Sequence, residues 1–142
     1  MTGMVVDASI TLSWFFDDEV SPFTEAVLDR IARIPTWVPV LWSLEFVNAL
    51  LNAQRRGRIK PAQRIAMLDH AIRLPLRVDH EAVSPVQIDK LAERYALSAY
   101  DAAYLELAIR RALPLVTLDK VLVNAARTAK HPVQTAVTPL RR

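Results

Sequence analysis

Four acidic residues stand among apolar neighbours, and this setting makes them the first candidates for chemistry. A carboxylate with apolar neighbours is costly unless it caps a helix, pairs with a cation or binds a metal ion. Helix capping, or the favourable field at a helix N-terminus, could explain each one taken alone. Capping needs a separate explanation for each of the four acids, whereas a shared metal ion explains all of them together. The four are Asp7 in MVVDASI, Glu45 in WSLEFVNAL, Asp101 in SAYDAAYLELA and Asp119 in LVTLDKVL.

If these acids lie together, they predict a site for a hard divalent cation. Carboxylates gathered at one place repel one another, so they stay ionised only with a cation among them. The sequence has no cysteine and only three histidines, with no close pair, so we expect oxygen ligands for Mg²⁺ or Mn²⁺. Such an ion lowers the pKa of a bound water and neutralises charge on a phosphate. The residues therefore predict metal-dependent phosphodiester cleavage, with the four acids as metal ligands and catalytic groups.

Three polar residues could support this site because of their spacing from the acids. Ser9 and Thr117 are each two residues from one of the aspartates. Asn48 is three residues after Glu45, which places both on one face of a helix. These side chains could hold a metal ligand or the attacking water. A local helix cap, or a hydroxyl at the end of a strand, explains the two hydroxyl residues at least as well.

Short apolar segments alternate with helical patterns along the chain, and this alternation predicts an α/β fold. All-apolar strands between helices are typical of a parallel sheet covered on both faces. Sites in such sheets lie beyond the carboxyl ends of the strands. We expect Asp7 and Asp119 at these strand ends, and Glu45 and Asp101 in the first turn of a helix, all at one rim. The expected strands lie near residues 4–6, 37–38, 76–78, 115–117 and 133–137, and the expected helices near 8–16, 22–33, 43–56, 61–74, 85–95, 99–112 and 120–129.

The composition is that of one globular domain. Of the 142 residues, 52% are hydrophobic and 23% charged, which excludes a disordered chain, and the lack of cysteine excludes a disulfide scaffold. No apolar stretch approaches the roughly 20 residues of a membrane span, and no basic signal region opens the chain. We therefore expect one cytoplasmic domain over residues 1–142. Trp14, Phe15, Phe16 and the pair Tyr100 and Tyr104 are expected in core or dimer contacts rather than as base-stacking platforms.

The charge is unevenly distributed, which favours a polyanionic substrate. The net charge is +3, yet six acids and no basic residue precede Arg30, and five basic residues and no acid follow Asp119. A dense basic run, RRGRIKPAQR, covers residues 55–64. Basic patches beside acidic centres suit a nucleic acid that is cleaved with metal ions. The alternative for the basic run is a solvated helix end and turn.

Three segments, taken in order, resemble the PIN-domain ribonucleases, and specifically the VapC-type toxins. They are VVDASITLSWFF, SLEFVNALLNAQRRGRI and LSAYDAAYLELAIRRALPLVTLDKVL. The resemblance spans nearly the whole chain, and its most specific part is the Y-D-A-x-Y-L-x-L-A helix followed by L-V-T-x-D. It implies a single PIN domain with a three-layer α/β/α fold, in which helices flank a central, mostly parallel sheet.

The resemblance also implies an activity, a metal and partners. It implies an endoribonuclease dependent on Mg²⁺ or Mn²⁺, the toxin of a bacterial pair, which forms a homodimer and is neutralised by a small VapB-type antitoxin. The family's acidic ligands fall on residues that lie within the matching motifs: Asp7, Glu45, Asp101 and Asp119. RNA phosphates or the antitoxin would meet a group of basic residues: Arg55, Arg56, Arg58 and Lys60.

One departure from the family pattern bears on the number of metal ions. Many relatives carry a further acid shortly after the last of the four, and here nothing acidic follows Asp119. This favours a one-metal site, or one completed by RNA phosphate. Asn124 is a weak candidate for the missing ligand.

Other readings of the acids fail at particular positions. A phosphatase of the haloacid dehalogenase class needs an aspartate two residues after the first, where this chain has Ser9. A receiver domain needs adjacent acids, and Ala8 follows Asp7. The remaining alternative is a catalytically silent PIN-like module that binds RNA or protein. A cluster of mutually repelling acids argues against it, because binding alone gains nothing from such a cluster.

Overall fold

The computed structural model describes residues 3–136, which form a central parallel sheet of five strands. The strand order is β3-β2-β1-β4-β5, and every neighbouring pair runs parallel. The chain builds the sheet in one direction from β1 to β3 and then crosses to the other side for β4 and β5. The switch point therefore lies between β1 and β4, where sites form in such sheets. The strands are β1 (Met4–Val6), β2 (Thr36–Pro39), β3 (Leu76–Asp79), β4 (Leu115–Val116) and β5 (Val133–Gln134).

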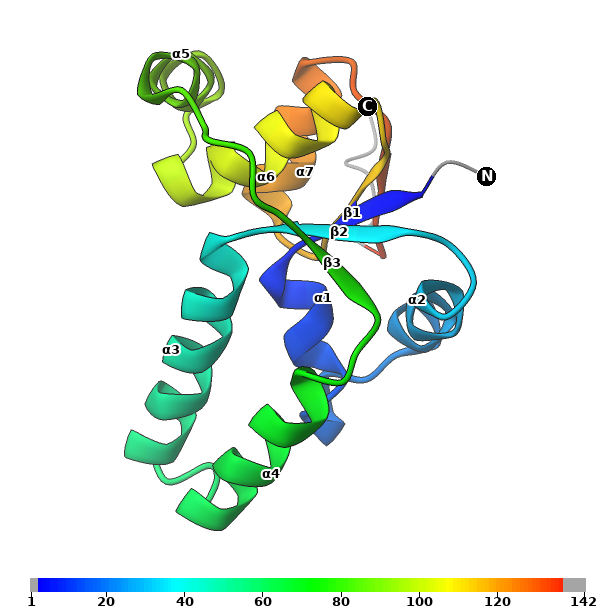
Figure 1. Ribbon diagram of the computed structural model, residues 1–142, viewed down its shortest axis with the longest axis vertical. Helices are drawn as coiled ribbons and strands as arrows, with labels where there is room; N and C mark the ends of the chain where they lie inside the picture. The colour runs from blue at the N-terminus through cyan, green and yellow to red at the C-terminus, as the bar shows by residue number, and fades with distance from the viewer. Residues whose placement is uncertain (1–2, 137–142) are drawn as a thin grey trace.

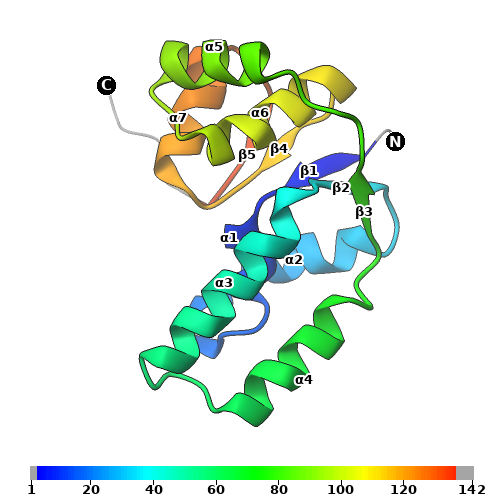
Figure 2. The same ribbon diagram turned by 60° about the vertical axis from the view of Figure 1, so that its left-hand side comes forward.

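Helices cover both faces of this sheet, which confirms the three-layer α/β/α prediction (Figure 1). Helices α5, α6 and α7 lie on one side, and α1 to α4 lie on the other. Helices α3 and α4 run side by side and project away from the sheet as a hairpin (Figure 2). The helices are α1 (Ala8–Ser13), α2 (Pro22–Ile31), α3 (Leu41–Arg55), α4 (Pro61–Ala71), α5 (Pro85–Tyr95), α6 (Ala99–Arg111) and α7 (Lys120–Thr128).

Hydroxyl side chains begin three of these helices, as the sequence predicts. Ser21 and Thr24 form a reciprocal capping box at α2, and Ser98 accepts a bond from the Asp101 amide at α6. At α5, Ser84 accepts from the Gln87 amide at 3.4 Å. Within residues 3–136, the Gln87 side chain does not return a bond to the Ser84 backbone, so α5 has no capping box.

The structure corrects several expected boundaries. Helix α3 begins at Leu41, two residues before the expected start, because Val40 already has helical backbone angles and no side chain caps the end. Glu45 therefore lies in the second turn of α3 rather than the first. Helix α1 ends at Ser13, and Asp17–Glu19 forms a short 3₁₀ turn, η1. Strand β5 ends at Gln134, and Val137, expected to end it, lies outside the described residues.

Both glycines occupy positions that other residues would strain. Gly57 ends α3 with a φ of +77°, as its place after the helical pattern predicts. Gly3 has a φ of +125° just before β1, and any side chain there would collide with the carbonyl oxygen of Pro35. The close approach of Gly3 to Pro35 aligns β1 with β2, because the Met4 amide donates to the same Pro35 carbonyl at 3.0 Å.

The core holds the strand ends in place from both sides of the sheet. All three residues of β1 are fully buried, with Ile10 of α1 and Phe46 of α3 on one side and Leu105 of α6 on the other. Burying each such side chain contributes roughly 1.5–3 kcal/mol. The aromatic segment 14–16 also packs against this core, as expected. No helix within residues 3–136 is long and apolar enough to cross a membrane.

Candidate active site

Asp7 lies at the carboxyl end of β1, where two hydroxyl groups hold its carboxylate. The side chain is 5% exposed. The Ser9 hydroxyl donates to its Oδ1 at 2.6 Å, and the Thr117 hydroxyl, from the end of β4, donates to its Oδ2 at 2.6 Å. The Ile10 amide donates to Oδ1 at 3.3 Å, so Asp7 also caps α1. The two hydroxyl residues predicted to support the site therefore contact its most buried acid.

The same hydroxyls connect Asp7 to Asp119. The Thr117 hydroxyl accepts from the Asp119 amide at 3.0 Å, and the Ser9 hydroxyl accepts from the Leu118 amide at 3.0 Å. Asp119 in turn caps α7, because its Oδ1 accepts from the Val121 amide at 2.9 Å. Each hydroxyl thus donates to a carboxylate and accepts from the backbone, which fixes the junction of β1 and β4.

Helices α3 and α6 supply the other two acids. Asp101 lies in the first turn of α6 and is partly exposed, and Glu45 is half-buried on α3. The Tyr104 hydroxyl donates to Oε1 of Glu45 at 2.6 Å, and Tyr104 itself is 1% exposed. Tyr104 was expected to be a core residue, which is confirmed, but its contact with Glu45 was not predicted. Its spacing of three residues after Asp101 is the sequence signal that could have revealed it.

The charges of the four acids act on one another in a chain. Burial, and then the charge of Asp119, raise the pKa of Asp7 to about 6, against the opposing hydrogen bonds from Ser9, Thr117 and the Ile10 amide. Burial and the charge of Asp119 raise the pKa of Asp101, which its Ser98 hydrogen bond opposes. Burial and the charge of Asp101 raise the pKa of Glu45, which the Tyr104 hydroxyl opposes. The fold thus places these acids close enough for their charges to interact.

The donor set suits a hard cation, although the side chains do not form a complete ligand shell. Within residues 3–136, no three acidic or imidazole side chains gather closely enough to hold a metal ion together. The donors are all oxygens, however, and burial together with mutual repulsion raises the pKa values of three acids, an effect that a bound cation would oppose. A carboxylate has about four acceptor positions, so the hydroxyl and capping bonds leave capacity for an ion. Binding through one or two carboxylates and several waters, as Mg²⁺ prefers, fits this arrangement.

Asn48 shares a surface hollow with Glu45, as its helical spacing predicts. The hollow has a volume of about 650 Å³ and is lined by α3 together with Tyr100 of α6. Tyr100 is 65% exposed, so it is not the core residue that one alternative predicted. The hollow therefore places Glu45 and Asn48 on the same exposed surface of α3.

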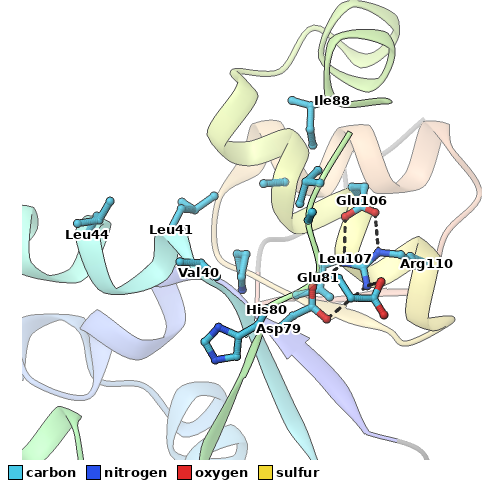
Figure 3. Close-up of a pocket in the computed structure, with 14 residues that line it drawn as sticks. Val40, Leu41, Leu44, Asp79, His80, Glu81, Ile88, Glu106, Leu107 and Arg110 are labelled. Carbon is cyan, nitrogen blue, oxygen red and sulfur yellow. Dashed lines mark hydrogen bonds and ion pairs between the residues drawn. The ribbon is translucent and has the colours of Figure 1, made fainter. Parts of the chain in front are cut away.

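A second hollow, of about 500 Å³, adjoins the first at Leu44 and contains an ion-pair cluster (Figure 3). Asp79, at the end of β3, lies 2.7 Å from Arg110 and 2.8 Å from Arg111. Burial alone would raise the pKa of Asp79, but these two arginines lower it below its ordinary value. Asp79 follows a strand as Asp7 does, yet arginines of α6 neutralise it, so it belongs to the scaffold rather than to the acid cluster.

Comparison with known proteins assigns the family. The family model of the PIN domain matches residues 4–128. The chain belongs to the PIN-domain family. It is similar to Ribonuclease VapC3 of two strains of Mycobacterium tuberculosis, CDC 1551 / Oshkosh and ATCC 25618 / H37Rv. Each is 31% identical over 122 residues, which cover 86% of both chains.

The PIN fold is also apparent from a solved structure. The crystal structure of PAE2754 from Pyrobaculum aerophilum superposes with a TM-score of 0.68 over 87% of this chain and 86% of that one, at 23% identity. The match to the PIN model includes all four acids and both hydroxyl residues that bind Asp7. The family resemblance and the α/β/α fold expected from the sequence are therefore confirmed.

Proposed function

We propose that this PIN domain is a metal-dependent endoribonuclease and the toxin of a VapBC-type toxin–antitoxin pair. The observation that carries the proposal is the set of four acids whose charges interact at the β1–β4 switch point. The similarity to proteins named Ribonuclease VapC3 supports RNA as the substrate class. Mg²⁺ or Mn²⁺ is the proposed cofactor because every donor is an oxygen.

In the proposed mechanism, each acid has a defined task. Asp7, Asp101 and Asp119 would hold the ion directly or through water, while Ser9 and Thr117 keep the Asp7 carboxylate in place. When bound, the ion supplies a water of lowered pKa and neutralises charge on the scissile phosphate. Glu45 completes the site or accepts the proton of the attacking water. The water oxygen bonds to phosphorus, the bond from phosphorus to the 3′ oxygen breaks, and that oxygen takes up a proton.

The first experiment measures Mn²⁺ binding by water-proton relaxation, without any substrate. We expect the wild type to bind Mn²⁺ and Asp7→Asn to lose binding, because Asp7 is the most buried of the four acids and its charge interacts with that of Asp119. Asp101→Asn should reduce cleavage of tRNA and rRNA fragments by more than the roughly 10- to 100-fold that loss of an outer-shell partner costs. Asp29→Asn, an exposed acid on α2, is the matched control for the change of charge and should behave as the wild type. Cleavage by Asp101→Asn at the wild-type rate would contradict the assignment.

A catalytically silent PIN-like module that binds RNA or protein is the second candidate. The observation in its favour is that no three acids within the described chain form a ready-made ligand shell. This module predicts equal, negligible Mn²⁺ binding by the wild type and by Asp7→Asn. Negligible binding also fits a site that RNA phosphate completes, so the measurement is repeated with an RNA fragment present. Only the silent module then predicts no difference between the wild type and Asp7→Asn.

The proposed partners are RNA, a VapB-type antitoxin and a second copy of the chain, and the proposed compartment is the cytoplasm. At the tip of the α3–α4 hairpin, Arg55, Arg56 and Lys60 are exposed and available to RNA phosphates or to the antitoxin. Arg58 is less available, because it pairs with Asp18 at 3.2 Å. The salt dependence of RNA affinity measures how many of these residues contact phosphates.

A further inference from the structure

The hydroxyl of Tyr104 donates a hydrogen bond to the acid cluster from the protein core. Its ring is packed in the core, and its hydroxyl reaches Oε1 of Glu45 at 2.6 Å. Burial first, then the bond and charge of Glu45 and the charges of Asp7 and Asp101, raise the pKa of Tyr104 above its ordinary range. The phenol hydroxyl therefore acts as the donor and the Glu45 carboxylate as the acceptor.

Glu45 relies on a single hydrogen bond, whereas Asp7 and Asp119 accept several. Asp7 is held by two hydroxyls and an amide, and Asp119 is held by the amides that it caps. Glu45 has a longer side chain with more rotamers, and Tyr104 is its only hydrogen-bond partner among residues 3–136. Its Oε2 accepts no hydrogen bond from these residues, so this oxygen is available to an ion or a water.

We propose that Tyr104 is a positioning residue of the acid cluster, which fixes the Glu45 carboxylate through Oε1 so that Oε2 serves the metal site. This inference rests on the proposed function, because it assigns Glu45 a task in that site. Tyr104 lies one helical turn after Asp101, so α6 presents the ligand and the positioning group on the same face. Helix α6 thereby sets the relative placement of Asp101 and of Glu45, which comes from α3.

The competing explanation is that Glu45 merely satisfies a buried hydroxyl, since buried polar groups need partners. A double-mutant cycle separates the two explanations. We would measure Mn²⁺ affinity by water-proton relaxation for the wild type, Tyr104→Phe, Glu45→Ala and the double variant. Loss of an outer-shell partner costs about 10- to 100-fold in metal affinity or activity, so Tyr104→Phe should weaken Mn²⁺ binding about 10-fold. Because Tyr104 acts through Glu45, it should have no further effect in the Glu45→Ala background.

Tyr95→Phe is the matched control, because it removes a hydroxyl from a partly buried tyrosine at the end of α5 that, within residues 3–136, donates to none of the four acids. Thermal unfolding of each variant checks the fold, and Tyr104→Phe keeps the ring that packs in the core. Wild-type Mn²⁺ affinity in Tyr104→Phe, or an equal loss in both backgrounds, would overturn this inference alone. If the wild type binds no Mn²⁺ either alone or with an RNA fragment, the proposed function fails and this inference fails with it.

Discussion

Asp7 shows that a capping residue and a candidate metal ligand can be the same side chain. Capping was the structural alternative for Asp7 and Asp119, and both do cap helices. Capping uses only part of the acceptor capacity of a carboxylate. The hydroxyls of Ser9 and Thr117 occupy further positions on Asp7 and hold it against the repulsion of its neighbour. The two explanations are therefore compatible at the level of single residues.

The raised pKa of Asp7 predicts that the metal-free protein is more stable when this carboxyl is neutral. Its pKa is about 6 in the folded protein, against an ordinary value of 3.8. The folded state therefore binds more protons between these values, and the free energy of unfolding falls as the pH rises through this range. Asp7→Asn has no carboxyl to ionise, so it avoids the loss of stability that ionisation of Asp7 causes. It should therefore raise the free energy of unfolding by about 1–3 kcal/mol near pH 7 in EDTA.

Urea denaturation between about pH 4 and pH 8, with EDTA present, measures this effect. The stabilisation by Asp7→Asn should shrink toward zero near pH 4, where Asp7 of the wild type is itself protonated. Mn²⁺ should stabilise the wild type and not the variant, because a ligand that binds only the folded state raises its stability. A variant less stable than the wild type at pH 7 in EDTA would contradict the prediction.

At the scale of elements, Asp79 joins the edge strand β3 to helix α6. Its carboxylate is 4% exposed and contacts two arginines, each of which is more than a quarter exposed. Asp79→Asn removes the charge and leaves both guanidinium groups without this partner. Breaking a buried pair costs 3–5 kcal/mol, and the partial exposure of the arginines reduces the expected loss of stability to about 1–3 kcal/mol. Urea denaturation of the variant measures it.

The control for Asp79→Asn is Asp69→Asn, which breaks an exposed pair between Asp69 of α4 and Arg73, just beyond the end of that helix. This substitution should change the free energy of unfolding by less than about 0.5 kcal/mol. Mn²⁺ affinity should be unchanged in both variants, because neither residue belongs to the acid cluster. Reduced Mn²⁺ binding by folded Asp79→Asn would show that Asp79 is more than a scaffold residue.

The sequence predicts elements more completely than contacts between them, and the reason is physical. Apolar segments, prolines and serine caps are local, and they predict the strands and most helix starts. Helix α3 begins earlier than expected because its first turn relies on packing rather than on a capping side chain. The bond from Thr117 to Asp7 joins residues 110 positions apart, and it exists because β4 pairs with β1. No local pattern contains that pairing, so the acids and the two hydroxyl residues were predictable as residues, while the bond that joins Thr117 to Asp7 was not.

At the scale of the whole molecule, the acid cluster adjoins a surface that is unusually apolar. Next to it, α3 exposes three apolar side chains near its start, and α6 exposes an aromatic ring. Two adjoining hollows share Leu44 and open onto this face. Contiguous exposed apolar surface on a globular protein marks an interaction site. The residues are Val40, Leu44, Val47 and Tyr100.

A second copy of the chain is the occupant that we predict for this face, as the family resemblance implies. A two-fold dimer joins the same patch on both copies, so one charged substitution places two like charges together in the interface. Leu44 is 73% exposed and lies in the middle of the patch, so Leu44→Glu should convert a dimer into a monomer without loss of fold. Ile72→Glu is the control, since Ile72 is 77% exposed beyond the end of α4, outside the patch. Light scattering after size-exclusion chromatography measures the mass, and a wild-type monomer, or a dimer that survives Leu44→Glu, would contradict the prediction.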